Sequence, residues 1–93
     1  KIESRVESLV FRDVRSRLIL ILFELAKGFG VEREDGSILL DVPITQAEFA
    51  TLVGSTRQSV NASLSELERR GLVGREGRKN VIVKPDELRQ QVR

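Results

Sequence analysis

The sequence predicts a small α+β domain, with a three-helix core, small β-hairpins and the tail of a longer helix in front. Two short helical segments are separated by a turn that contains Gly54, and a strand-turn-strand pattern directly follows the second segment. The stretch from Leu18 to Ala26 is apolar on almost every side, which is typical of a helix buried in a core. The chain of 93 residues has room for one such domain.

The composition excludes several kinds of active site. The chain has no cysteine and no histidine, so disulfides, thiolate metal sites and the most common general base are missing. Since no catalytic pair, metal cluster or phosphate loop is visible, we predict neither an enzyme nor a metal site. The longest apolar run, from Leu18 to Phe23, is too short to cross a membrane, which favours a cytoplasmic module with no membrane partner.

The charge is unevenly distributed along the chain. The formal charge is +2, but residues 1 to 54 hold seven basic and nine acidic residues, whereas residues 55 to 93 hold nine basic and five acidic residues. A basic carboxy-terminal part favours nucleic acid as a partner, although runs of charge are more often solvated surface.

The first ten residues have the spacing of a helix, since Ile2, Val6 and Leu9 are four and three residues apart with charges between them. This segment is too short for a stable free helix. It is either the end of a dimerisation helix or a helix that packs on its own domain. The chain begins at Lys1 and not at methionine, so we expect a fragment in which residues 1–10 end a dimer helix and residues 11–93 form the domain.

Turn and capping residues divide the next part of the chain. Asp13 is predicted to cap a helix that begins at Val14 and is stopped by Gly28 and Gly30. Residues 31 to 42 contain Asp35-Gly36, a signal for a type I′ turn, and predict a short hairpin that Pro43 closes.

A helix-turn-helix follows this hairpin. Thr45 and Glu48 have the spacing of a capping box, which predicts a helix from about Gln46 that Gly54 ends. Ser55 and Thr56 can cap a second helix, from about Arg57 to Arg70, which Gly71 ends. Residues 72 to 84 predict two strands around a turn near residues 76 to 79, and Pro85 can start a last short helix. Two helices, a turn and a hairpin together predict a winged helix-turn-helix.

The second of these helices presents a polar surface at its amino end. Val60, Leu64 and Leu67 share one face, which must be buried. Arginine is the most common partner of guanine in the major groove, and glutamine and asparagine can pair with adenine. Residues of these types stand at the exposed edge of the helix, so we predict that bases are read by Arg57, Gln58 and Asn61.

Hydroxyl and basic side chains around this helix suit DNA phosphates. The hydroxyl groups of Ser55, Thr56 and Ser59 can bind phosphate oxygens, but helix capping alone also explains them and is the more common role. At the tip of the hairpin, Arg78 and Lys79 are predicted to contact the DNA backbone. The remaining basic residues of this part are interpreted as solvated charge: Arg75, Lys84, Arg89 and Arg93.

These motifs resemble the carboxy-terminal DNA-binding domain of CRP/FNR-type bacterial transcription regulators. The similarity covers about residues 6 to 88. It rests on Phe11-Arg-Asp-Val-Arg-Ser-Arg-Leu, on the segment from Ile44 to Asn61, and on Gly71-Leu-Val with the hairpin and Lys84-Pro85.

The resemblance implies a role for individual positions. Arg57 matches an arginine that contacts guanine, and Gln58 stands where many members have a base-reading glutamate. Ala62 belongs to the same base-reading set, but several members place a second arginine there, so that contact should be missing. Asp13 matches a hinge residue, and Val14 opens a helix whose end approaches phosphate. Phosphate contacts are further implied for Thr45, Gln46, Thr56 and Ser59.

The resemblance also implies the function and the partners. Two copies in a homodimer would place helices 57–70 in successive major grooves, about 34 Å apart, with the wings at residues 75–82 on the DNA backbone. A cyclic nucleotide or another effector would bind an amino-terminal domain absent from this chain, so the chain itself is expected to hold no cofactor. RNA polymerase is a candidate partner, and the bacterial nucleoid is the implied location. The alternative is a winged helix for protein-protein interaction, in which Arg57 and Arg78 meet an acidic partner.

Overall fold

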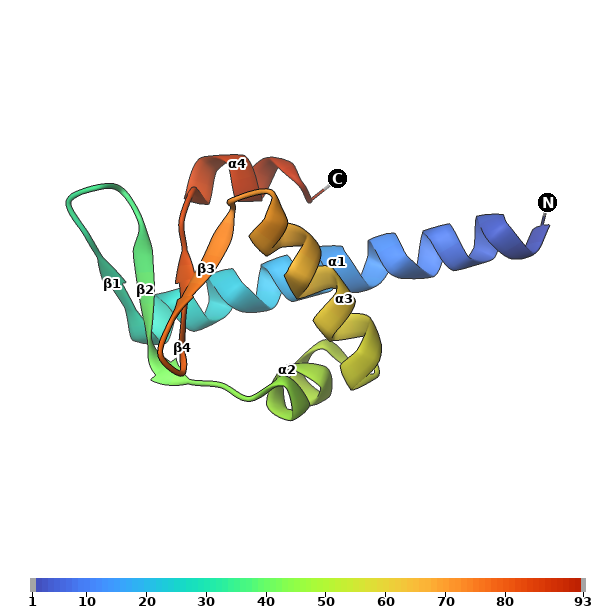
Figure 1. Ribbon diagram of the computed structural model, residues 1–93, viewed down its shortest axis with the longest axis horizontal. Coiled ribbons are helices and arrows are strands. Elements are labelled where there is room, and N and C mark those ends of the chain that lie inside the picture. The colour runs from blue at the N-terminus through green and yellow to red at the C-terminus, as the bar shows by residue number, and fades with distance from the viewer. Residues whose placement is uncertain (1, 93) are drawn as a thin grey trace.

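The computed structural model describes the backbone of residues 2–92 and the side chains of residues 13–92. Four helices surround one small sheet, which confirms the predicted α+β winged helix-turn-helix (Figure 1). The elements in chain order are α1 (Ile2–Phe29), β1 (Gly30–Glu32), β2 (Ile38–Pro43), α2 (Gln46–Val53), α3 (Arg57–Arg69), β3 (Val73–Glu76), β4 (Lys79–Ile82) and α4 (Pro85–Gln90).

The first helix is longer than predicted. α1 continues through Asp13 without a break, so the prediction that Asp13 caps a helix beginning at Val14 is wrong. No glycine or proline precedes Gly28 to interrupt the helix. The Asp13 carboxylate instead lies 3.3 Å from the guanidinium of Arg17, one turn further along the same helix.

Both ends of α1 differ from expectation. Gly28 does not stop the helix, which ends at Phe29, and Gly30 begins β1. One continuous helix spans the boundary that we predicted between residues 10 and 11, and its amino-terminal part extends away from the body of the domain (Figure 1). The predicted dimer-helix side chains of Ile2, Val6 and Leu9 lie outside the described side chains.

The two predicted hairpins form a single antiparallel sheet with the strand order β1-β2-β4-β3. The first hairpin pairs β1 with β2, and the second pairs β3 with β4. The sequence prediction did not join them, but β2 pairs with β4, with Leu39 opposite Val81. The second hairpin, residues 73–82, is called the wing below. Its position depends on this pairing with a strand about forty residues earlier in the chain.

The turn of the first hairpin is not of type I′. That turn needs a positive φ angle at both central residues, and no residue other than glycine has one in the described backbone. The loop is longer, and Gly36 alone has a positive φ angle, 90°. Asp35 accepts hydrogen bonds from the Ser37 amide at 2.9 Å and the Ser37 hydroxyl at 2.7 Å. The Ser37 hydroxyl is the main reason why the pKa of Asp35 lies below its ordinary value.

The capping residues of the helix-turn-helix act as predicted. The Thr45 hydroxyl accepts from the Glu48 amide at 3.1 Å, while the Glu48 carboxylate accepts from the Thr45 amide at 2.8 Å. Gly54 ends α2 with a left-handed φ angle of 78°, which a residue with a side chain adopts only at a cost. Thr56 then caps α3 by accepting from the Ser59 amide. These local bonds fix where α2 ends and where α3 begins.

The core lies where α1, α2, α3 and the inner face of the sheet meet. The predicted apolar face of α3 is buried in it, with Val60 and Leu67 fully inaccessible to solvent and Leu64 nearly so. Further buried side chains come from every layer: Leu18, Ile19 and Leu22 of α1, Phe49 and Val53 of α2, Leu40 and Ile82 of the sheet, and Leu88 of α4. The amino end of α3 is thereby held at the surface next to α2 (Figure 1).

Replacement of Phe49 by alanine should destabilise the domain strongly. Phe49 is the largest side chain of the core and is only 1% exposed, so its removal leaves a cavity and should lower the free energy of unfolding by about 3 to 5 kcal/mol. Urea denaturation followed by circular dichroism measures this change. The matched control on the same helix is Leu52→Ala, where the side chain is 49% exposed and the expected loss is less than about 1 kcal/mol. Equal losses in the two variants would contradict the packing described here.

Replacement of Glu48 by glutamine should make stability less dependent on pH in the acid range. Hydrogen bonds from Thr45 hold the pKa of Glu48 below its ordinary value of 4.5. Such a carboxylate stabilises the folded state at pH values above its ordinary pKa. This contribution is lost as the pH falls through the lowered pKa. Urea titrations from about pH 6 to about pH 3 should therefore show a smaller decline for Glu48→Gln than for the parent chain. Parallel declines would show that the capping box does not contribute in this way.

Candidate nucleic-acid interface

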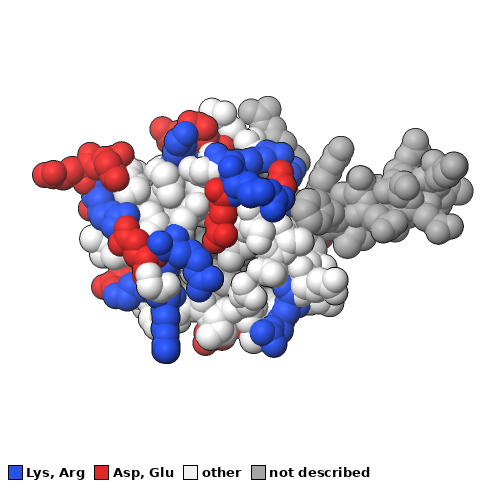
Figure 2. Space-filling view, viewed as in Figure 1, with Lys and Arg blue, Asp and Glu red and all other residues white. Residues whose placement is uncertain are grey.

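A cleft of about 510 Å³ separates the start of α3 from the wing. We call it the basic cleft, because three of the residues that line it are arginines: Pro43, Ile44, Thr45, Gln46, Arg57, Arg75 and Arg78. Figure 2 shows Lys and Arg side chains over the wing and, across a hollow, over the start of α3. The fold thus brings together four residues that the sequence predicted as separate contacts, namely Thr45, Gln46, Arg57 and Arg78.

The arginines of the basic cleft are not neutralised by neighbouring acids. Arg57, Arg75 and Arg78 make no ion pair with any other described side chain. Most other described basic residues do have a carboxylate partner: Arg17, Lys27, Arg33, Arg69, Arg70, Lys79 and Arg89. Three unpaired arginines around one hollow create a positive potential that suits an anionic ligand.

Arg75 is a residue of this cleft that sequence reasoning missed. It was interpreted as solvated charge, because the sequence does not say which side of the wing faces α2. In the structure Arg75 is exposed, lies opposite Asn80 in the hairpin, and lines the cleft with Arg78. Its position near the end of the first wing strand, one residue before the end of β3, could have indicated that Arg75 lies near the wing tip with Arg78.

Lys79 differs from the other basic residue at the wing tip. Its ammonium group lies 2.6 Å from the carboxylate of Asp41, across the pairing between β4 and β2. Lys79 is therefore engaged within the protein, whereas Arg78 is exposed at the basic cleft. A second ion pair joins the two hairpins, between Arg33 and Glu76 at 2.8 Å.

The amino end of α3 presents the predicted base-reading residues together. Arg57, Gln58, Asn61 and Ala62 are all exposed, and the first turn of the helix carries no acidic residue. The positive end of the helix dipole points in the same direction, which favours a negatively charged ligand. Asn61 is the one member of this set whose side chain has a described hydrogen bond: its Oδ1 accepts from Nε2 of Gln46, at the start of α2, at 2.7 Å.

The hydroxyl residues are engaged in local structure. The Thr56 hydroxyl accepts from the Ser59 amide at 3.1 Å and donates to the Ser59 hydroxyl at 3.0 Å, so it does cap α3. The amide of Ser55 donates to the carbonyl of Ala50 at the end of α2. Helix capping thus accounts for Thr45 and Thr56. A contact between these hydroxyl groups and phosphate stays a prediction.

Val14 does not line the basic cleft. Its side chain is 1% exposed and packs in the hydrophobic core. Because α1 continues through this position, Val14 lies inside a helix and does not open one. The expectation that Val14 begins a helix is therefore wrong, whereas the phosphate contact at this position stays a prediction.

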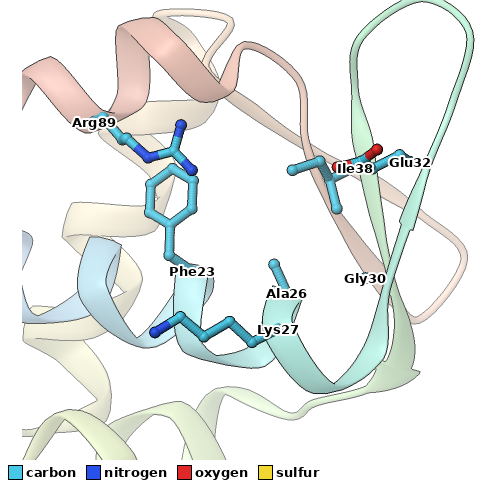
Figure 3. A pocket seen from close by; sticks show the side chains of 7 residues that line it. All are labelled: Phe23, Ala26, Lys27, Gly30, Glu32, Ile38 and Arg89. Carbon is cyan, nitrogen blue, oxygen red and sulfur yellow. The ribbon is translucent and has the colours of Figure 1, made fainter.

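A second hollow of similar volume lies between α1, α4 and the first hairpin (Figure 3). Phe23, Ala26 and Ile38 make it partly apolar, and the guanidinium of Arg89 lies 4.6 Å from the centre of the Phe23 ring. This contact holds α4 against α1. Lys27 and Glu32 both line the hollow, so it has no single charge.

The described residues hold neither a cluster of metal ligands nor a membrane-spanning helix. Among them there is no group of three or more potential metal-ligating side chains. None of the helices in the same part of the chain is long and apolar enough to cross a membrane.

Comparison with known families agrees with this geometry. The model of the Crp-like helix-turn-helix domain matches residues 16–91, which include α2, α3 and the wing. The chain belongs to this family. The predicted resemblance to CRP/FNR-type regulators is confirmed, and the Crp-like domain is one of the DNA-binding helix-turn-helix domains of transcription regulators.

Two curated relatives illustrate the similarity. The Crp-like chain is 33% identical over 90 residues to the CRP-like cAMP-activated global transcriptional regulator of Mycobacterium tuberculosis, over 97% of this chain and 40% of the relative. It is 32% identical over 93 residues to the anaerobic regulatory protein of Bacillus subtilis, over 99% of this chain and 39% of the relative. The chain thus spans about two fifths of the length of these relatives.

Solved structures show the same fold. The CO-dependent transcription factor CooA from Carboxydothermus hydrogenoformans superposes with a TM-score of 0.80 at 28% identity. The match covers 95% of the Crp-like chain and 40% of CooA.

Proposed function

We propose that the chain binds double-stranded DNA in a sequence-specific way, as the output domain of a CRP/FNR-type transcription regulator. The observation that carries this proposal is the basic cleft, where the exposed amino end of α3 and two wing arginines face the same hollow. Family membership supports it. Three unpaired arginines match the charge of a phosphate backbone, and an exposed helix beside them fits a major groove.

In this proposal α3 reads the bases. The apolar face of α3 is buried in the core, so the helix can enter a groove only with its opposite face and its amino end. Arg57 would pair with guanine, while Gln58 and Asn61 offer amides to neighbouring base edges. Ala62 offers a methyl group, which can contact thymine but makes no hydrogen bond.

The wing and the start of α2 would hold the DNA backbone. Arg75 and Arg78 lie on the far side of the basic cleft from Arg57, so a strand that runs beside the major groove passes between them. Thr45 and Gln46 stand at the amino end of α2, where backbone amides and the helix dipole attract phosphate. Ser55, Thr56 and Ser59 add hydroxyl groups at the start of α3.

Two copies would act together on one site. The amino-terminal part of α1 extends away from the basic cleft, so contact between two copies there leaves both α3 helices free (Figure 1). A homodimer would then read two half-sites about 34 Å apart. An effector would bind outside the described domain, and RNA polymerase would be a further partner of the DNA-bound dimer.

Fluorescence anisotropy with duplex DNA at two salt concentrations tests the proposal. Phosphate contacts predict tighter binding at low salt, because binding releases counterions. If no duplex binds even at low salt, the proposal is overturned, and the basic cleft would have to serve an acidic protein partner.

Replacement of Arg57 and of Arg78 should have different effects on DNA binding. Arg57→Ala should weaken binding to the preferred sequence by about 1 to 3 kcal/mol and abolish the preference for one guanine, because a bidentate contact is lost. Arg78→Ala should weaken binding to all sequences alike and reduce the slope of log K against log salt by about 1. Titrations of both variants with preferred and random duplexes measure these effects. If Arg57→Ala weakens both duplexes equally, Arg57 does not read a base.

Replacement of Asp41 should release Lys79 for DNA. In Asp41→Asn the partner charge is lost, so the freed ammonium group can reach phosphate and should make the salt slope steeper by up to about 1. Anisotropy titrations over a series of salt concentrations measure the slope. The control is Lys79→Ala, which should change the slope little in the parent chain but remove the gain in the Asp41→Asn background. If the slope of Asp41→Asn stays steeper when Lys79 is also replaced, the cause is the general loss of negative charge and not the release of Lys79.

A further inference from the structure

The carboxyl-terminal end of α3 carries two adjacent arginines that share one carboxylate. Glu66 accepts a hydrogen bond from Arg69 at 2.6 Å and another from Arg70 at 3.0 Å. Because one negative charge faces two positive charges, this cluster keeps one positive charge in excess. Figure 2 shows Lys and Arg side chains gathered over this end of α3, on the face of the molecule that also carries the basic cleft.

The two arginines lie on different sides of α3. The side of the helix opposite its buried residues, called the outer face below, consists of residues three or four positions apart: Gln58, Ala62, Ser65 and Arg69. Arg70 lies about 100° further round the helix. Its guanidinium donates to Oε1 of Gln91, just after α4, at 2.9 Å. Of the two arginines, Arg69 alone adds positive charge to the face predicted to read DNA.

The position of Arg69 along α3 suits the border of a major groove. The helix rises about 1.5 Å per residue, so Arg69 lies about 16 Å further along it than Gln58. The major groove is about 12 Å wide and is bordered by the phosphates of both strands. When the amino end of the helix lies at the base edges, Arg69 therefore lies near the rim of the groove. A guanidinium at the rim meets phosphate oxygens and not bases.

We propose that Arg69 is a further phosphate-binding residue, so that the DNA contact extends along the whole outer face of α3. The contact strengthens binding to every sequence alike, because the phosphate backbone is the same for all of them. It adds a second anchor for the helix, at the end remote from Arg57. This inference rests on the proposed function, since it requires α3 to lie in the major groove.

The surroundings of Arg69 favour such a contact. Its side chain is 69% exposed. A guanidinium has several N–H donors, and the described bond to Glu66 uses one of those of Arg69, so others remain for a phosphate. The same bond restricts the positions that the long side chain can take, which lowers the entropy lost when a ligand binds. The outer face holds no acidic residue, and Glu68 lies about 100° away from Arg69 round the helix.

Arg69→Ala and Arg70→Ala form a matched pair of variants, because each removes one positive charge and one bond to the Glu66 carboxylate. Arg69→Ala should weaken binding to preferred and random duplexes alike by about two- to tenfold, the factor expected from one hydrogen bond. It should also reduce the slope of log K against log salt by about 1. Arg70→Ala should change both quantities much less. Arg69→Lys keeps the charge, so it should retain the slope of the parent chain.

Duplexes with neutral phosphates locate the contact. The parent chain first selects a preferred duplex from a randomised pool, and one phosphate at a time is then replaced by an uncharged methylphosphonate. Anisotropy titrations give the affinity of each protein for each duplex, and circular dichroism checks that the variants are folded. The parent chain should lose affinity at every phosphate that it contacts. At one of these phosphates Arg69→Ala should show no further loss, whereas Arg70→Ala should lose as much as the parent chain.

The outcomes are distinct. A lower slope in Arg69→Ala but not in Arg70→Ala, together with one phosphate to which only Arg69→Ala has become insensitive, supports the inference. Equal losses in the two variants point to net charge alone and overturn it, as does any other result. Arg57→Ala is measured in parallel: if it abolishes the preference for one guanine, the proposed DNA reading stands even where the role of Arg69 fails. If the parent chain binds no duplex, the proposed function itself is wrong.

Discussion

The burial of one face of α3 against α1 is the constraint on which the rest of the site depends. Val60, Leu64 and Leu67 are 0 to 3% exposed, and each buried side chain of this size contributes about 1.5 to 3 kcal/mol. A rotation of α3 about its axis would expose this face, so the opposite side of the helix is fixed towards solvent. The exposure of Gln58 and Ala62 follows from the packing of their neighbours, since neither side chain has a described polar contact of its own.

The second constraint is the pairing of β2 with β4, which decides where the wing stands relative to α3. Two ion pairs between the hairpins, Lys79 with Asp41 and Arg33 with Glu76, follow from the same pairing. Exposed ion pairs stabilise little by themselves, but they determine which basic side chains remain available. The net charge of +2 therefore says less about ligand binding than the pattern of pairing does. Three of the four described arginines without an acidic partner line the basic cleft, and Arg15 of α1 is the fourth.

Much of this domain is predictable from local sequence, because its helix ends depend on bonds between residues three or four positions apart. The capping box at Thr45, the turn at Gly54 and the cap at Thr56 are of this kind. The same reasoning failed at Asp13, which is of a residue type that often caps helices. The residues before it are also helical, and its carboxylate forms an ion pair with Arg17 one turn later. It failed again at Asp35, whose carboxylate bonds to Ser37 within a longer loop.

The parts of the site that were not predictable depend on contacts between distant segments. Arg75 and Arg57 line one cleft only because β4 pairs with β2, and Gln46 reaches Asn61 only because α2 packs across α3. Residue type alone suggests that an asparagine on a reading helix pairs with adenine, but that expectation assumes a freely rotating amide. In the structure the Asn61 side chain is hydrogen-bonded to Gln46, fifteen residues earlier, so part of its hydrogen-bonding capacity is already used. The contacts open to a residue on such a helix thus depend on polar neighbours from other segments as well as on the residue itself.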